Sequence, residues 1–351
     1  MRVVVTGATG NVGTSVLEAL GADASVDEIV GVARRLPGEL RMPKTEWVSA
    51  DVLTSDLEAI FRGADCVIHL AWLIQPSRDK SLLDAVNVQG SERVMKAVAA
   101  AEVKSLVVAS SVGAYSTGPK DRLVDESWPT DGIDSCYYSR EKAAVERLLD
   151  RFEADSRETR VVRLRPAIIL KPEAAAGIRR LFVGPLLPNF LVRRRLIPIV
   201  PDTKRLAFQV VHSRDVGEAY RLAATGEASG AFNIASEPVV DARFLEKLLG
   251  ARSVQVPPPA LRAAASLTWR LHLQPTDPGW VDMGLGTPLL DSSRAERELG
   301  WTPERSADRT VGDFLEALRE GRGFPTPPLA SSTAGPMRIR EFTSGVGSRQ
   351  G

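Results

Sequence analysis

The stretch RVVVTGATGNVG, residues 2–13, decides the fold of this chain. It opens on a short run rich in valine, which is typical of a strand buried on both faces of a parallel sheet. Closely spaced glycines follow, and residues 14–20 then carry apolar side chains at helical spacing up to Gly21, which we expect to cap the helix. The pattern predicts a strand, a glycine turn and a helix.

The glycines of this turn favour binding of a dinucleotide. A pyrophosphate can lie on a helix N-terminus only where amide groups point at it and no Cβ blocks its approach. The spacing is G-x-x-G-x-x-G rather than G-x-G-x-x-G, but its place between a strand and a helix supports nucleotide binding. The turn residues that we expect to contact the cofactor are Gly7, Thr9, Gly10, Asn11, Val12 and Gly13.

The end of the second predicted strand, residues 28–33, indicates which dinucleotide binds. NAD-binding folds usually place a carboxylate there for the ribose hydroxyls. This chain has Ala33 followed by Arg34 and Arg35. An acid would repel a 2′-phosphate, whereas an arginine can bind it through several N–H donors. The sequence therefore favours NADP(H) over NAD(H), and solvated loop charges are the alternative interpretation of both arginines.

Strands and helices continue to alternate along the first half of the chain. Further strands are predicted at 47–50, 65–71, 104–109 and 160–170, and helices at 56–61 and 81–100. This alternation predicts an α/β fold with a doubly wound parallel sheet. In such sheets ligands bind along the carboxyl edge of the strands.

Several residues follow the predicted strand ends at that edge. Asp51 lies where a side chain could meet the adenine, and Asn87 could support neighbouring loops. His69 ends an apolar run, so we interpret it as a structural histidine with its hydrogen bonds satisfied and not as a catalytic group.

A second informative segment is YYSREK, residues 137–142. Tyr138 and Lys142 are one helical turn apart and share a helix face. A phenol titrates near pH 10, and an ammonium one turn away favours its anion, which is what proton exchange at neutral pH requires. Tyr137 is the rival phenol, but Glu141 follows it by one turn and would raise its pKa. An ordinary surface pair is the alternative for Tyr138 and Lys142.

With these features in order, the chain resembles the extended short-chain dehydrogenase/reductase family of NAD(P)-dependent epimerases, dehydratases and reductases. The match covers roughly residues 1–320 and rests on motifs that occur in the order of the family. They are TGATGNVG (6–13), Asp51-Val52, HLA (69–71), NVQG (87–90), SSVGAY (110–115), Tyr138-x-x-x-Lys142, RLRP (163–166), VHSRDV (211–216), AFNI (231–234) and LGWTP (299–303).

The resemblance implies catalytic roles for Ser111, Tyr138 and Lys142. Tyr138 would act as general acid or base while a hydride moves between nicotinamide and a carbon bearing oxygen. Lys142 would favour the tyrosinate and bind the nicotinamide ribose, so both residues would also contact the cofactor. Ser111 would hold the reacting oxygen by a hydrogen bond. The cofactor contacts that the resemblance adds to the glycine turn are Asp51, Val52, Leu70, Ala71 and Asn87.

The resemblance also implies an architecture and a class of reaction. A Rossmann-type domain would span residues 1–166, with 211–235 returning to it, and a smaller C-terminal substrate-binding lobe would span 167–210 and 236–325. We expect an oxidoreductase that acts on a small carbonyl or alcohol metabolite. The alternatives are a sugar or nucleotide-sugar epimerase or dehydratase that retains its nicotinamide, and a dinucleotide-binding sensor without turnover.

The lobe decides the substrate. Relatives that act on nucleotide-linked sugars commonly place an arginine for the diphosphate just before the His-x-x-Asp landmark, where this chain has Phe208 and Gln209. Arg193 to Arg195, Lys204 or Arg205 could serve instead, although a solvated rim is favoured for them. We interpret Trp269, Trp280, Phe182 and Phe190 as core residues rather than pocket residues. The apolar content of the lobe would suit a hydrophobic or aromatic carbonyl compound.

Composition excludes several other classes of protein. The 351 residues are 44% hydrophobic and 25% charged with a net charge of +1, which is ordinary for a globular protein and argues against nucleic acid as a partner. Cys66 and Cys136 form neither a disulfide framework nor a metal-ligand cluster. We find no signal peptide or membrane helix, and we expect a cytoplasmic protein.

Two further expectations concern assembly and the chain end. The family often forms homodimers through a four-helix interface, here the helices at about 81–100 and 137–153. Residues 326–351 are rich in Ser, Thr, Gly and Pro, which predicts a disordered tail.

Overall fold

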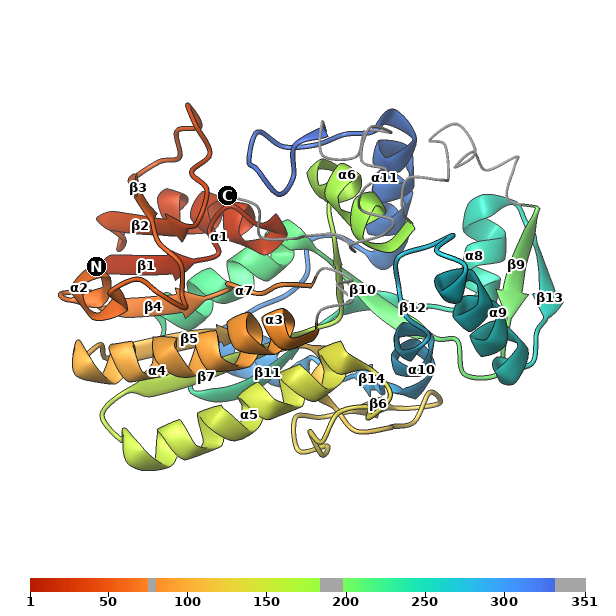
Figure 1. The fold of residues 1–351 in the computed structure, drawn as a ribbon, viewed down its shortest axis with the longest axis horizontal. Helices are drawn as coiled ribbons and strands as arrows, with labels where there is room; N and C mark the ends of the chain where they lie inside the picture. The colour runs from red at the N-terminus through yellow and green to blue at the C-terminus, as the bar shows by residue number, and fades with distance from the viewer. Residues whose placement is uncertain (75–79, 184–197, 332–351) are drawn as a thin grey trace.

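The computed structural model, which describes residues 1–74, 80–183 and 198–331, is built on a parallel sheet of seven strands (Figure 1). The strand order is β11-β7-β5-β4-β1-β2-β3, so β1 lies inside the sheet and the order reverses beside it. The strands are β1 (Arg2–Thr6), β2 (Glu28–Ala33), β3 (Thr45–Ser49), β4 (Cys66–His69), β5 (Ser105–Ala109), β7 (Arg160–Pro166) and β11 (Gly230–Ile234). This order confirms the doubly wound Rossmann-type sheet, a fold in which ligands commonly bind at the point where the strand order reverses, here the carboxyl ends of β1 and β4.

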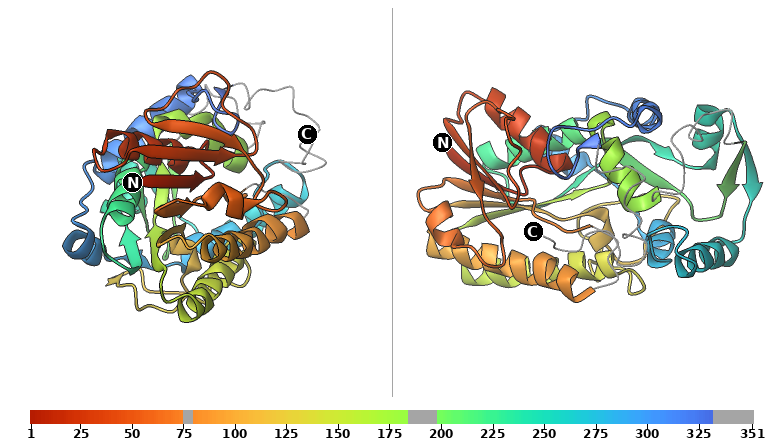
Figure 2. Two further views of the ribbon diagram at one scale, coloured as in Figure 1. Left: turned by 90° about the vertical axis from the view of Figure 1, so that its left-hand side faces the viewer. Right: turned by 45° about the horizontal axis from the view of Figure 1, so that its top comes forward.

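Helices cover both faces of this sheet (Figure 2). Successive residues of a strand point to opposite faces. Thus Val3 and Val5 of β1 pack with α1 (Asn11–Ala22) and α7 (Ser213–Thr225), while Val4 packs in the core on the other face. The helices of that other face are α2 (Leu57–Phe61), α4 (Gly90–Ala100) and α5 (Tyr137–Asp155).

Three small sheets, built from strands that lie between residues 123 and 290, stand beyond the carboxyl edge of the main sheet (Figure 1). Their strands are β8 (Ile168–Leu170), β10 (Phe208–His212) and β12 (Ser236–Val240), then β9 (Ile199–Asp202) with β13 (Arg252–Gln255), and β6 (Leu123–Val124) with β14 (Leu289–Leu290). The remaining α-helices are α3 (Lys80–Asp84), α6 (Ala175–Ile178), α8 (Ala242–Leu249), α9 (Pro258–Arg270), α10 (Gly279–Gly286) and α11 (Ala307–Glu320). Short 3-10 and π turns are η1 (Ala85–Gln89), η2 (Val112–Ala114), η3 (Pro172–Ala174), η4 (Arg179–Val183) and η7 (Ala295–Leu299).

Three local expectations were wrong. Gly21 does not cap α1, because the helix continues to Ala22 and the absence of a side chain at Gly21 instead lets Pro43 approach, within 3.1 Å of where a Cβ would lie. The strand predicted at 160–170 divides into β7 and β8, which belong to different sheets.

The third wrong expectation concerns the start of the predicted disordered tail, residues 326–331. Thr326 donates a hydrogen bond from Oγ1 to the Thr9 carbonyl oxygen at 2.9 Å, and Leu329 is only 5% exposed. Disorder was expected from residue 326, but these contacts hold the segment against the glycine turn. Residues 332–351 lie outside the described part of the chain.

Packing of α1 against α7 yields a test of the fold. A Cβ at Gly217 of α7 would lie 2.6 Å from the Ser15 carbonyl oxygen of α1, whereas a Cβ at Gly284 of α10 would have open space. Alanine improves helix propensity by about 1 kcal/mol at either position. We expect Gly217→Ala to destabilise the protein by about 1–3 kcal/mol because the two helices must separate. Gly284→Ala should be neutral or stabilising. Denaturant unfolding checks both, and equal midpoints would contradict this packing.

Candidate active site

The glycine turn connects β1 to α1 and contacts the segment that follows β4. Gly7 has φ +74°, a conformation that glycine adopts without strain, and its amide donates to the Val32 carbonyl oxygen of β2 at 2.9 Å. A Cβ on Gly7 would lie 2.7 Å from the Ala71 nitrogen, and one on Gly13 would lie 2.6 Å from the Ala8 carbonyl oxygen. The turn therefore needs glycine at both positions, and it lies against Leu70 and Ala71.

The start of α1 fits an anionic group. Gly10 precedes the helix in an extended conformation, and no side chain of the described residues caps it. Asn11 donates from Nδ2 to the Ile169 carbonyl oxygen at 3.3 Å, while its buried Oδ1 has no partner among the described residues. Unsatisfied amides at a helix N-terminus, together with the helix dipole, bind phosphate well. These are the features that the predicted pyrophosphate site requires.

The other predicted cofactor residues differ in how exposed they are and in what they contact. Arg34 and Arg35 are exposed just after β2. Asp51 accepts a hydrogen bond at Oδ1 from the Leu53 amide at 2.9 Å, in the turn after β3. Val52 is a buried core residue, and its Cγ2 would lie 2.9 Å from a Cβ on Gly90, so glycine at position 90 lets α4 approach it.

Asn87 lies in the π turn η1 and braces the loop after β4. Its Oδ1 accepts from the Leu73 amide at 2.7 Å, and its Nδ2 donates to the Leu73 carbonyl oxygen at 2.9 Å and to Glu141 Oε2 at 2.8 Å. Both amide hydrogens are therefore used within the protein. Burial raises the pKa of Glu141 to about 7 against the opposing effect of the Asn87 hydrogen bond. Asn87 thus holds the loop that carries Leu70 and Ala71.

His69 has the structural role expected of it. Its Nδ1 is hydrogen-bonded to Thr6 Oγ1 at 2.8 Å and its Nε2 to Ser91 Oγ at 3.0 Å. Burial lowers the pKa of His69 to about 3, with the charge of Lys142 adding to the effect. The ring is therefore neutral at physiological pH and joins β1, β4 and α4.

Ser111 and Tyr138 meet at the carboxyl end of β5. Ser111 Oγ accepts a hydrogen bond from the Gly113 amide at 3.0 Å and is also hydrogen-bonded to the Tyr138 phenol. A Cβ on Gly113 would lie 2.8 Å from Tyr138 Cε1, so glycine admits the ring. Burial raises the pKa of Tyr138 to about 12, and the Ser111 hydrogen bond offsets this only in part. The same pattern holds for Tyr137, where burial is the main cause of a raised pKa.

Lys142 lies close to the ring of Tyr138. The lysine is 3% exposed, and its Nζ donates to the Ala109 carbonyl oxygen at 2.7 Å. Nζ lies 3.4 Å from the ring centroid of Trp72 and 5.9 Å from that of Tyr138. Burial lowers the pKa of Lys142 to about 7 despite Glu146 and Glu141. The sequence predicts a lowered pKa for the Tyr138 phenol. Burial of Tyr138 and Lys142 has the opposite effect, so the phenol stays neutral in the protein without a ligand.

Aromatic rings enclose Tyr138, and sequence reasoning missed them. Trp280 of α10 stacks on Tyr138 with centroids 5.1 Å apart, and Phe182 meets Trp280 edge-on at 5.0 Å. Trp72 meets Tyr138 edge-on at 6.0 Å. The interpretation of Trp280 and Phe182 as core residues was therefore wrong. Only Trp72, next to the HLA motif, had a local signal that could have identified it.

Lys120 and Arg205 hold the C-terminal end of α10, and thereby Trp280. Lys120 Nζ donates to the carbonyl oxygens of Ala207 at 2.7 Å and Gly284 at 3.0 Å. Arg205 donates to Leu285 at 3.0 Å and Gly118 at 2.6 Å. Cations suit the last carbonyls of a helix. Arg205 is therefore used structurally, and Arg193 to Arg195 lie outside the described residues.

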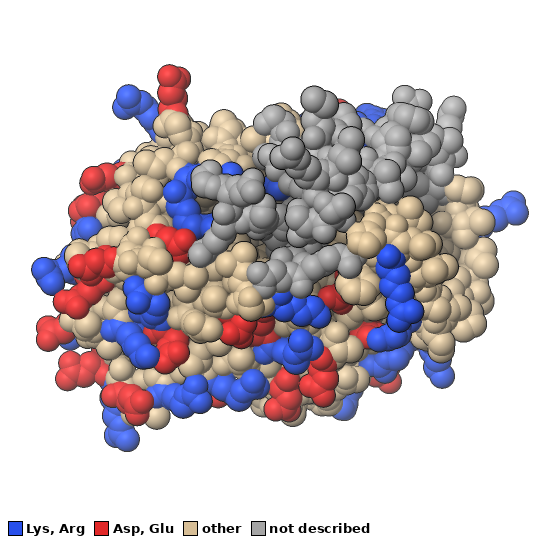
Figure 3. Space-filling model, in the orientation of Figure 1, with Lys and Arg blue, Asp and Glu red and all other residues tan. Residues whose placement is uncertain are grey.

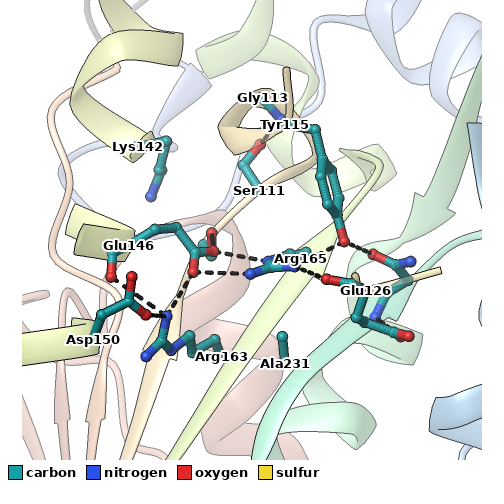
Figure 4. A network of polar contacts seen from close by, with 12 residues as sticks. Ser111, Gly113, Tyr115, Glu126, Lys142, Glu146, Asp150, Arg163, Arg165 and Ala231 are labelled. Atoms are coloured by element: carbon teal, nitrogen blue, oxygen red, sulfur yellow. Dashed lines mark hydrogen bonds and ion pairs between the residues drawn. The ribbon is translucent and has the colours of Figure 1, made fainter. Parts of the chain in front are cut away.

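A buried carboxylate anchors the helix that carries Tyr138 and Lys142 (Figure 4). Glu146 of α5 accepts from Ser110 Oγ at 2.5 Å and from Arg165 at 2.8 and 3.0 Å. Arg163 also donates to it at 3.0 Å, and Arg165 continues to the Tyr115 hydroxyl at 3.0 Å. Burial disfavours the charge, but Arg165, Ser110 and Arg163 outweigh it and lower the pKa of Glu146 to about 2. The network ties α5 to β5 and β7.

Other kinds of site receive no support from the described residues. They contain no group of three or more His, Cys, Asp or Glu side chains arranged to hold a metal ion. None of their helices combines the length and apolar character needed to cross a membrane. On the face in Figure 3, acidic and basic side chains are interspersed.

Glu146 provides a stability test with an exposed control. Glu146→Ala leaves two buried arginines without their main counter-ion, and we expect it to destabilise the protein by about 3–5 kcal/mol. Glu158→Ala removes the exposed pair with Lys104 and should change stability by about 0–1 kcal/mol. The stabilisation by Glu146 is present above the ordinary glutamate pKa and is lost as pH falls toward about 2. Unfolding at neutral pH checks the pair, and equal losses would contradict the role of the network.

Comparison with known proteins gives the family. An uncharacterized protein of Mycobacterium tuberculosis is 26% identical over 322 residues, 91% of this chain, although the chain spans only 30% of that relative. The UDP-glucose 4-epimerase of Mycolicibacterium smegmatis is 26% identical over 335 residues, 91% of this chain and 99% of that protein. The solved UDP-glucose 4-epimerase of Thermus thermophilus in complex with NAD superposes with TM-score 0.67 at 21% identity, covering 91% and 99% of the two chains. A family model matches residues 3–235, and the chain belongs to the NAD dependent epimerase/dehydratase family.

Proposed function

We propose that this chain is an NAD-dependent enzyme that oxidises a secondary alcohol of its substrate and returns the hydride to the same carbon. The observation that supports this most strongly is the meeting of Ser111, Tyr138 and Lys142 beside the glycine turn. Gly7 contacts Ala71, the neighbouring Trp72 covers Lys142, and Ser111 is hydrogen-bonded to Tyr138. These contacts support a dinucleotide site that is continuous with a proton-transferring phenol.

Tyr138, Ser111 and Lys142 have separate roles in the proposed reaction. NAD, when bound, supplies a hydride acceptor and donor. Tyr138 takes the proton from the substrate hydroxyl and gives it back to the carbonyl oxygen, and Ser111 holds that oxygen. Because burial raises the pKa of Tyr138 to about 12, a nearby positive charge is needed for it to act as a base. Lys142 is charged at pH values below its pKa of about 7, and it supplies part of this positive charge.

We propose NAD(H) as the cofactor and not the NADP(H) that the sequence favours. The Thermus epimerase is in complex with NAD. The inference of NADP(H) depends on Arg34 and Arg35, which are both exposed. An arginine at such a position can bind a 2′-phosphate but does not require one.

Epimerisation of a nucleotide-linked sugar is the outcome that we favour, supported by the two named epimerases among the relatives. Net reduction of a hydrophobic carbonyl compound is the second candidate, because Trp280 and Phe182 surround Tyr138. Dehydration is less well supported, since elimination needs a further acid and base. The turn after Ser111 carries only Val112, Gly113 and Ala114, and Glu141 is bound to Asn87.

Three further points stay proposals. We retain the domain division at residues 1–166, 167–210, 211–235 and 236–325. We also retain a cytoplasmic location and a homodimer formed through the helices at 81–100 and 137–153.

Tyr138→Phe tests the acid/base role. Removing the hydroxyl should lower turnover at least about a hundredfold, the size expected for loss of a general acid or base, while NAD binding survives. Tyr137→Phe is the matched control and should keep turnover within about threefold. Steady-state rates and NAD titrations check both variants. Persistent activity in Tyr138→Phe would show that another group moves the proton.

Retention of the cofactor separates the two candidate outcomes. For an epimerase we expect NAD to remain bound through purification and no net change in nicotinamide absorbance with UDP-glucose as the probe. Steady consumption of added NADH with a carbonyl panel would favour the second candidate. A clear preference for NADPH over NADH in the same titrations would overturn the choice of cofactor.

A further inference from the structure

A buried lysine lies directly behind the glycine turn. Lys171, the residue after β8, is 3% exposed, and its Nζ donates to Thr14 Oγ1 at 2.6 Å and to Ser15 Oγ at 3.2 Å. Thr14 Oγ1 in turn donates to the carbonyl oxygen of Gly10, the residue that precedes α1, at 3.1 Å. Lys171 is thus joined through one hydroxyl to the turn that would receive the pyrophosphate.

The C-terminal segment covers this lysine. Lys171 Nζ lies 5.6 Å from the ring centroid of Phe324, and Thr326 is fastened to the Thr9 carbonyl oxygen. The segment therefore keeps water from the lysine and from Thr9.

The groups around Lys171 do not fully offset the cost of burying its positive charge. Burial lowers the pKa of Lys171 to about 8, with Glu18 of α1 and Glu173 of η3 opposing this and Arg214 of α7 adding to it. His212, at the end of β10, is kept neutral because burial lowers its pKa to about 4. No side-chain ion pair to Lys171 occurs among the described residues, and the positive end of the α1 dipole lies beside it. A buried cation at a helix N-terminus needs a nearby anion.

We propose that Lys171 is a positioning residue for the cofactor, holding the first turn of α1 through Thr14 and attracting the pyrophosphate from behind the glycine turn. This inference rests on the proposed function only in that the chain binds a dinucleotide. It assigns the lysine to cofactor affinity and not to hydride or proton transfer, and the covering segment at residues 322–331 strengthens the attraction by excluding water.

The test compares a charged ligand with an uncharged one. Lys171→Met removes the charge and keeps the length of the side chain, and Lys171→Arg keeps the charge. We expect Lys171→Met to weaken NAD⁺ binding about tenfold, as a charge interaction across several ångströms would. Binding of adenosine, which lacks phosphate, should change less than about twofold. Lys171→Arg should bind NAD⁺ nearly as the parent protein does. Calorimetric titration measures all of these affinities, and thermal unfolding confirms that each variant is folded.

The pH dependence provides a second readout. NAD⁺ affinity of the parent protein should fall as pH rises above about 8, where free Lys171 loses its proton, but not in Lys171→Arg, which stays charged. Equal loss of NAD⁺ and adenosine binding in Lys171→Met, or no loss of either, would overturn the inference while leaving the proposed function intact. If the parent protein binds no NAD⁺, both fail.

Discussion

The carboxylate of Glu146, buried between Arg163 and Arg165, is the interaction on which the candidate site depends. Burying an ion pair gives little net stability, but removing one partner leaves an uncompensated charge, so the arrangement fixes geometry. Glu146 lies one turn beyond Lys142 on α5 and accepts from Ser110, the neighbour of Ser111. One carboxylate therefore sets the position of α5 relative to the end of β5, and Tyr138 meets Ser111 as a consequence.

The ionisable groups of the candidate site lack the charged partner that a bound ligand would bring. Burial suppresses ionisation of Tyr138 and lowers the pKa of Lys142, so the protein alone favours the uncharged form of each. Behind the glycine turn, Lys171 adds to the positive end of the α1 dipole, where a pyrophosphate would supply the missing negative charge. Trp72 lies over Lys142, and Trp280 stacks on Tyr138, which keeps both groups in a region of low polarity. In such surroundings a bound charge has a larger effect than it would in water.

Local patterns predicted much of this. The alternation of apolar runs and glycines identified β1, β2 and the turn between β1 and α1, because these features depend on neighbouring residues. Motif spacing selected Ser111 and Tyr138, which the structure brings together. Trp280 could not be predicted in this way, since its contact with Tyr138 depends on how the lobe folds back and on the cations that hold α10. The direction of the Tyr138 pKa shift was wrong for a similar reason: sequence spacing gives the distance to Lys142 along a helix, but not the burial that dominates the shift.

The most direct test of the account is the ionisation of Tyr138 with and without cofactor. Ultraviolet difference spectra of tyrosinate, recorded against pH for the parent protein and with Tyr138→Phe as the blank, isolate this one phenol. We expect it to ionise near pH 12 in the free protein. In the NAD⁺ complex it should ionise below the ordinary phenol value of about 10, since the positive charge brought beside it favours the anion. Ionisation at the same pH in both states would contradict the claim that the site prepares Tyr138 to exchange a proton with the substrate.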